Sequence, residues 1–191
     1  MASLDRVLER KMPHADPADR LRLAEAILDE ARHAAVDPFF VMALIAVESG
    51  FKHEAESHRG ARGLMQMLPS TLQSEVERSE IEGEIDDPVT HVRAGVRYYR
   101  RLLRAFGSHD MALMAYNAGP NRILKYLKQD APIPSSIQAY ARRVGHEFSR
   151  LRPQRAAKPA KAAEKTAPAP TVAKGAVAVT APAVAPGAAT Q

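Results

Sequence analysis

The most pronounced feature of the polar and apolar pattern is an uninterrupted apolar run from Phe39 to Val47. Periodicity alone does not distinguish a buried strand from a buried helix here, so the flanking residues must decide. Asp37 can cap a first helical turn, Pro38 suits the first helical position, and Gly50 suits the left-handed residue that often follows a helix. We therefore predict a helix from Pro38 to about Ser49, buried nearly all round. The run is too short to span a bilayer.

Apolar residues at helical spacing predict further helices in residues 1–150, and no alternating strand pattern accompanies them. The pairs Asp16-Pro17 and Asp87-Pro88 repeat the same cap signature. The fold class is therefore expected to be all-α. Residues 51–62 lack periodicity and are predicted to form a loop. The further helices are expected at residues 1–12, 17–34, 88–106, 110–118, 121–129 and 134–150, and from residue 69 or 70 onward.

The helix expected at residues 88–106 has two opposite stripes, one apolar and one basic. A basic stripe could bind phosphate, but we interpret it as a solvated helix face because residues 1–150 have no net charge. The acidic segment 75–87 is likewise expected to lie mostly in solvent. The apolar stripe consists of Val92, Val96, Tyr99, Leu103 and Phe106, and the basic stripe of Arg93, Arg97, Arg100, Arg101 and Arg104.

The net charge of +5 belongs to the C-terminal part of the chain. Six of the 27 basic residues and one of the 22 acidic residues lie in residues 151–191, so residues 1–150 carry 21 of each. A neutral folded part does not indicate a nucleic-acid partner, and we expect none. The chain has no cysteine, which excludes disulfides and thiolate metal sites.

Composition divides the chain into a globular part and a low-complexity tail. Beyond Leu151 the sequence consists mainly of Ala, Pro, Lys, Thr and Val, without aromatic residues, and is predicted to be a disordered tether or spacer. We expect an N-terminal extension at residues 1–15, one domain at residues 16–150 and the Ala/Pro/Lys-rich tail at residues 151–191. The first residues show no apolar stretch of signal-peptide length.

Glu48 is the first candidate for chemistry, since it extends the apolar run into the last turn of the predicted helix. Desolvation and the negative end of the helix dipole both disfavour its charged form and should raise its pKa. A carboxyl that stays protonated near neutral pH can act as a general acid. Taken alone, Glu48 is more readily interpreted as the point where the apolar stretch meets water.

Two further segments combine residue types that suit an uncharged polar ligand. Residues 60–71 contain glycines, Met65 and Gln66, and residues 115–120 place Tyr116 and Asn117 at a helix end. One acid with amides, hydroxyls and an aromatic ring, without a phosphate loop or metal ligands, indicates a hydroxyl- and amide-rich ligand such as a carbohydrate. Each segment taken alone is only weak evidence for such a ligand.

Together these segments resemble the catalytic domains of soluble lytic transglycosylases, which share the goose-type lysozyme fold. The motifs occur in that family's order, and the resemblance covers about residues 17–150. It implies cleavage of peptidoglycan glycan strands between N-acetylmuramic acid and N-acetylglucosamine, leaving a 1,6-anhydro end, with no metal or cofactor. The motifs are Glu-Ser-x-Phe at 48–51, Gly-Ala-x-Gly-Leu-Met-Gln at 60–66 with Pro69 and Thr71, and Ala-Tyr-Asn-Ala-Gly-Pro at 115–120.

The resemblance also implies roles for individual residues. Glu48 matches the family's single catalytic acid and base, and Tyr140 matches a tyrosine whose hydroxyl helps to position the acid and the substrate. The loop after the acid is more charged than is usual in the family, because it contains His53, Glu54, His58 and Arg59. The residues that the resemblance assigns to substrate binding are Ser49, Ser57, Met65, Gln66, Tyr116, Asn117 and Tyr140.

No second acid is predicted to lie in an apolar setting like that of Glu48. A single acid would require the substrate's own N-acetyl oxygen to stabilise the cationic anomeric carbon, a known exception to the two-carboxylate rule. The remaining alternatives are a lysozyme-type hydrolase that uses Glu54 or Asp87 as second carboxylate, a non-catalytic glycan-binding module and, last, a helical nucleic-acid binder. The substrate implies action in the cell envelope or periplasm, although no signal peptide is visible. We expect a monomer.

Overall fold

The computed structural model describes residues 2–153. This part of the chain is helical, and its only β pairing consists of isolated bridges of Arg62 with Glu56 and with Met67. The predicted all-α class is confirmed. Apart from residues 151–153, the predicted disordered tail lies outside the described residues. The helices are α1 (Ala2–Lys11), α2 (Pro17–Ala34), α3 (Pro38–Glu48), α4 (Pro69–Arg78), α5 (Pro88–Phe106), α6 (His109–Ala118), α7 (Pro120–Lys128) and α8 (Ser135–Leu151).

Three helices, α2, α3 and α5, begin where their cap residues predicted, and at α2 the side chain of Asp16 accepts a hydrogen bond from the Ala18 amide at 2.7 Å. The side chain of Asp37 accepts a hydrogen bond from the Phe39 amide at 2.9 Å, and that of Asp87 accepts one from the Val89 amide at 3.1 Å. These bonds satisfy backbone donors that an α-helix leaves free in its first turn. At its other end α5 stops at Gly107, whose φ of 68° is the left-handed conformation that favours glycine.

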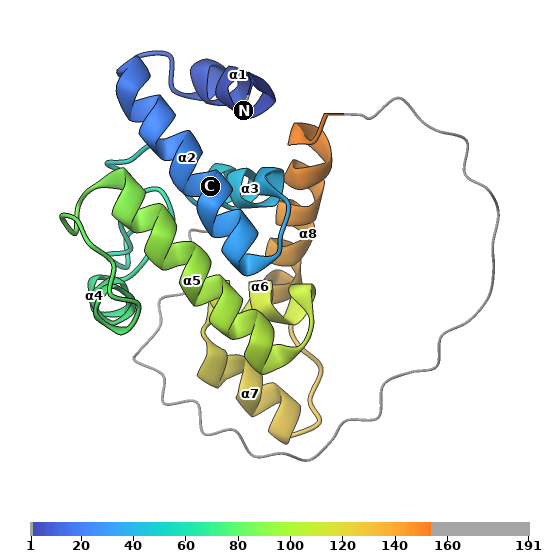
Figure 1. Cartoon of the computed structure of the whole chain (residues 1–191). Coiled ribbons are helices and arrows are strands. Elements are labelled where there is room, and N and C mark those ends of the chain that lie inside the picture. Colours follow the sequence, from blue (N-terminus) through green and yellow to red (C-terminus); the bar gives the residue numbers. More distant parts are fainter. Residues whose placement is uncertain (1, 154–191) are drawn as a thin grey trace.

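Helix α3 lies inside the bundle (Figure 1). It packs against α2 and most extensively against α8, while α5 packs against α2, α4 and α6. Residues 41–45 of α3 are completely buried, and the helix ends at Glu48, one residue before the predicted end. The predicted central helix is therefore confirmed, with burial complete only in its middle, because residues 38–40, 46 and 47 are half-buried. None of the described helices is both long and apolar enough to cross a membrane.

Helix α1 contributes to the same core as the other helices. Leu4, Val7 and Leu8 are buried, and α1 packs against α2. In Figure 1 the helix lies at the end of the bundle where α2 begins. The separation of residues 1–15 from the domain that follows remains a prediction.

The basic face of α5 is not simply solvated, which corrects the interpretation from sequence. Arg97 Nε donates to both carboxylate oxygens of Glu30 on α2, at 3.0 and 3.1 Å, and Arg101 forms an ion pair with Glu75 on α4. Glu30 is 2% exposed and Glu75 is 1% exposed. The acidic segment 75–87 was expected to lie mostly in solvent. Glu75 is an exception, because α4 packs its carboxylate against α5.

The loop between α3 and α4 packs closely against α5. At Gly95, in the middle of α5, an added Cβ would lie 2.7 Å from the Cβ of Met65 in that loop. No side chain larger than hydrogen fits there unless the loop shifts. The packing of α5 against the loop thus requires glycine at this position, although glycine lowers helix propensity.

We expect Gly95→Ala to lower the free energy of unfolding by about 1 to 3 kcal/mol, because it overpacks Met65. Gly145→Ala is the matched control, since Gly145 lies within α8 and nothing lies within 4 Å of its added Cβ. That control should raise stability by about 0.5 to 1 kcal/mol through helix propensity. Urea unfolding of both variants measures the difference, and equal effects would contradict this account of the contact.

Candidate active site

Glu48 is a buried carboxyl at the end of α3. It is 7% exposed and is followed by Ser49, Gly50 at φ 60° and the buried Phe51 at φ 69°, so the chain turns sharply away from the helix. Burial raises the pKa of Glu48 from 4.5 to about 7, because desolvation disfavours the charged form. A substantial fraction of this carboxyl is therefore protonated at neutral pH, as the apolar setting predicted.

Tyr140 on α8 is the hydrogen-bond partner of this carboxyl. Its hydroxyl donates to Glu48 Oε1, and the side chain is 2% exposed. Burial, followed by the nearby Glu48, raises the pKa of Tyr140 well above 10, which keeps the hydroxyl protonated. The structure thus brings together two residues that the sequence analysis placed in one site, although they lie 92 positions apart.

Arg143 was not predicted as part of the site, but it lies beside both of these residues. Its guanidinium lies 5.8 Å from the centre of the Tyr140 ring, and its positive charge lowers the pKa of Glu48 in opposition to burial. A cavity of about 550 Å³ borders the site here, with Val47 and Arg143 in its lining. Arg143 directly follows Arg142, and nothing in the sequence distinguishes the two arginines.

Tyr116 connects α6 to the loop that precedes α4. Its hydroxyl donates to the backbone oxygen of Met65 at 2.8 Å. Burial raises the pKa of Tyr116 well above 10, and the nearby Glu48 adds to the increase. Tyr116 therefore lies close enough to the acid to feel its charge. Its hydroxyl, however, is engaged with the loop backbone.

Met65 and Gln66 have internal packing and hydrogen-bonding roles in this structure. The side chain of Met65 is completely buried. Gln66 adopts a positive φ of 43°, and its Nε2 donates to the backbone oxygens of Ala55 at 2.8 Å and Gly63 at 3.2 Å. These contacts fix the shape of residues 55–66. Contact of the two side chains with a ligand remains a prediction.

The two candidate serines also bond to the backbone. Ser49 Oγ donates to the Leu64 oxygen at 3.0 Å, which joins the end of α3 to the loop. Ser57 Oγ accepts from the Ala61 amide at 3.0 Å within a tight turn. Both side chains are half-buried. They help to shape the loop, and their predicted contact with substrate is not tested by these bonds.

Asn117 is the candidate with unused hydrogen-bonding capacity. Its side-chain oxygen is buried and has no hydrogen-bond partner among the described residues. It lies in the last turn of α6, next to Tyr116, where Gly119 at φ 93° redirects the chain into α7. A buried acceptor without a donor is unfavourable, so a ligand N–H or O–H would be a suitable partner.

The other buried carboxylates differ from Glu48 in their partners. Glu30 and Glu75 are also buried, contrary to the prediction that no other acid lies in such a setting, but each is paired with an arginine. No second carboxylate in residues 2–153 contributes to the pKa shift of Glu48. The same residues contain no cluster of three or more side chains suited to holding a metal ion.

Comparison with known proteins identifies relatives of this chain and of its fold. The family model described as "Transglycosylase SLT domain" matches residues 25–136. The soluble lytic murein transglycosylase of Escherichia coli (strain K12) is 33% identical over 98 residues, which is 48% of this chain and 15% of that protein. A transglycosylase of Enterobacteria phage PRD1 is 31% identical over 87 residues, 46% of this chain and 31% of that protein.

Solved structures show the same helical fold. The 70-kDa soluble lytic transglycosylase of E. coli matches with a TM-score of 0.60 and 25% identity, over 66% of this chain and 23% of that one. An inactive Glu-to-Gln mutant of the lytic transglycosylase Slt from Pseudomonas aeruginosa matches with a TM-score of 0.60 and 24% identity, over 75% and 25% of the chains. The present chain thus spans only a minor part of the length of these relatives.

Glu48→Gln should be more stable than the wild type at alkaline pH. The folded carboxyl titrates at about 7 and the unfolded one near 4.5, so the wild type loses stability as pH rises through this interval. The amide does not titrate, and its advantage should grow by up to about 3 kcal/mol between the two values. Urea unfolding at several pH values measures this difference. Glu54→Gln, at a well-exposed position, is the control, and a pH-independent advantage of Glu48→Gln would contradict the assignment.

Proposed function

The chain belongs to the Transglycosylase SLT domain family, and from this membership we propose that it is a peptidoglycan lytic transglycosylase. The bond cleaved is the β-1,4 bond from N-acetylmuramic acid to N-acetylglucosamine, without addition of water. The observation that carries the proposal is the buried carboxyl of Glu48, with a pKa raised to about 7 and a hydrogen bond from Tyr140. Such a group can both donate and accept a proton near neutral pH.

In the first step Glu48 acts as general acid. Its proton passes to the glycosidic oxygen as the bond to the anomeric carbon of N-acetylmuramic acid breaks, and the N-acetylglucosamine portion leaves as an alcohol. The substrate's own N-acetyl oxygen is proposed to stabilise the positive charge at the anomeric carbon, as in the known exceptions to the two-carboxylate rule. Tyr140 and Arg143 stabilise the carboxylate that remains.

In the second step the Glu48 carboxylate acts as general base. It takes the proton of the C6 hydroxyl, whose oxygen attacks the anomeric carbon and closes the 1,6-anhydro ring. The acid is thereby restored to its protonated form, so the cycle needs no added water, metal or cofactor. One group can serve both steps because its pKa lies near neutral pH.

We assign the surrounding residues to substrate binding. Asn117 offers the unpaired side-chain oxygen described above, which suits an acetamido N–H or a sugar hydroxyl. Tyr140 is proposed to position both the acid and the sugar. The remaining members of the proposed set are Ser49, Ser57, Met65, Gln66 and Tyr116.

The proposed partner is a peptidoglycan glycan strand, and the proposed compartment is the cell envelope, where that polymer lies. The protein is proposed to act as a monomer on this substrate.

Digestion of purified sacculi followed by mass spectrometry tests the activity. We expect anhydro-ended fragments, and Glu48→Gln should lower their yield by about 100-fold or more because the amide cannot transfer a proton. Glu54→Gln should leave the yield unchanged. Reducing ends with added water would instead establish a lysozyme-type hydrolase, and an unchanged yield from Glu48→Gln would favour a glycan-binding module without this chemistry.

Tyr140→Phe should alter both the rate and its pH dependence. Loss of the hydroxyl removes a bond that lowers the pKa of Glu48, so the pKa should rise above 7 and the alkaline decline in rate should move to higher pH. The maximal rate should fall roughly 10- to 100-fold. Tyr126→Phe, at a half-buried position on α7, is the control. A lower rate with an unshifted profile would contradict a direct role at the acid.

A further inference from the structure

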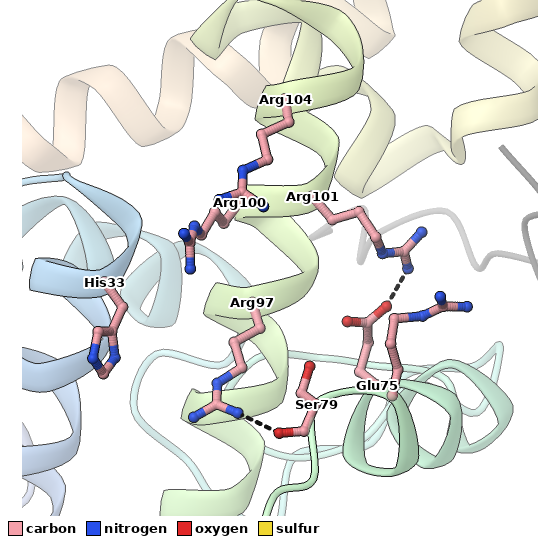
Figure 2. Close-up of a pocket in the computed structure, with 8 residues that line it drawn as sticks. His33, Glu75, Ser79, Arg97, Arg100, Arg101 and Arg104 are labelled. Carbon is pink, nitrogen blue, oxygen red and sulfur yellow. Dashed lines mark hydrogen bonds and ion pairs between the residues drawn. The ribbon is translucent and has the colours of Figure 1, made fainter. Parts of the chain in front are cut away.

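A second polar cavity lies apart from Glu48, between α2, α4 and α5. Its volume is about 440 Å³, and five of its lining residues are arginines. Figure 2 shows arginines along α5 facing His33 on one side and Glu75 with Ser79 on the other. None of its lining residues belongs to the proposed active site. The lining consists of His33, Glu75, Arg78, Ser79, Arg97, Arg100, Arg101 and Arg104.

Two of the arginines are held in place by the protein. Arg97 is paired with Glu30 and its Nη1 also donates to the Ser79 oxygen at 2.7 Å. Arg101 is paired with Glu75, and its guanidinium lies 5.0 Å from the centre of the Tyr98 ring. These contacts give the cavity a charged wall of fixed geometry (Figure 2).

The other three arginines have no partner among residues 2–153. Arg78, Arg100 and Arg104 make no hydrogen bond or ion pair with any described residue. Arg97, Arg100, Arg101 and Arg104 recur at helical spacing, so their charges share one face of α5. Like charges at this spacing repel, and Glu30 and Glu75 neutralise only two of the five arginines. A bound anion would relieve the remaining repulsion.

We propose that this cavity binds a discrete oxyanion with two or more phosphate groups. A guanidinium presents N–H donors in a planar fork that matches phosphate oxygens, and one phosphate can accept from more than one fork. The volume lies within the usual range of small-ligand sites, and it exceeds the needs of one phosphate group. The concave shape favours a compact ligand over a flat membrane surface.

The distribution of charge argues against a nucleic-acid groove. Residues 1–150 carry equal numbers of acidic and basic groups, so the positive charge is local to the cavity. A duplex or long single strand would need a basic surface that extends along its backbone. A short polyphosphate or a multiply phosphorylated small molecule requires only the cavity itself. The site is therefore separate in chemistry as well as in position from the one proposed for the glycan strand.

Isothermal titration calorimetry of the full chain with tripolyphosphate tests the proposal. We expect the triple variant Arg78→Gln, Arg100→Gln and Arg104→Gln to bind at least about 100-fold more weakly than the wild type, because several charge-assisted hydrogen bonds are lost. The matched control is Arg122→Gln, Lys125→Gln and Lys128→Gln, which removes the same charge from exposed positions of α7. The control should bind as the wild type does.

Several outcomes would overturn the proposal. The first two are that the wild type does not detectably bind tripolyphosphate and that both triple variants lose the same affinity for it. The other two are that citrate binds more tightly than tripolyphosphate and that the cavity arginines affect binding only to phosphatidylglycerol vesicles. Thermal unfolding separates binding from folding, since the cavity variant should be at least as stable as the wild type without ligand and should lose the stabilisation by tripolyphosphate. If the triple variant does not fold, Arg100→Gln alone provides the same comparison with a smaller loss of affinity.

Discussion

The hydrogen bond from Tyr140 to the buried carboxyl of Glu48 is the interaction on which the proposed chemistry depends. A carboxyl removed from water must either stay protonated or, as a carboxylate, accept hydrogen bonds from a donor. Glu48 can adopt both forms near neutral pH. Burial raises its pKa to about 7, while Tyr140 and Arg143 limit the increase. The bond also joins α3 to α8, so the packing that encloses the acid supplies its partner.

The buried glutamates of this domain show how a partner determines what a carboxyl can do. Glu30 and Glu75 are each paired with an arginine, which compensates the charge and fixes the side chain between two helices. Glu48 has a neutral hydroxyl as its hydrogen-bond donor, and Arg143 acts on it only through its charge. Similar burial therefore gives structural ion pairs at two positions and a titratable group near neutral pH at the third.

The loop between α3 and α4 supports the site mainly through its backbone. Tyr116 donates to the Met65 oxygen, Ser49 donates to the Leu64 oxygen, and Gln66 bonds back to its own loop. Gly95 allows Met65 to pack closely on α5. Residues that would be expected to face a ligand thus also hold the loop in place, and a substitution at one of them would change both the shape of the loop and any contact with the substrate.

The sequence by itself determined the helices, their ends and the apolar setting of Glu48, because cap residues, apolar spacing and the position of Glu48 after an apolar run are local features. Its resemblance to a known family also assigned Tyr140 and Tyr116 to one predicted site. Only the tertiary structure decided which arginines of α5 are paired and that Arg143 lies beside the acid, since these contacts join residues far apart in the chain. Helical periodicity identifies the face of the helix on which a residue lies. Which residue of another helix it contacts depends on how the helices pack.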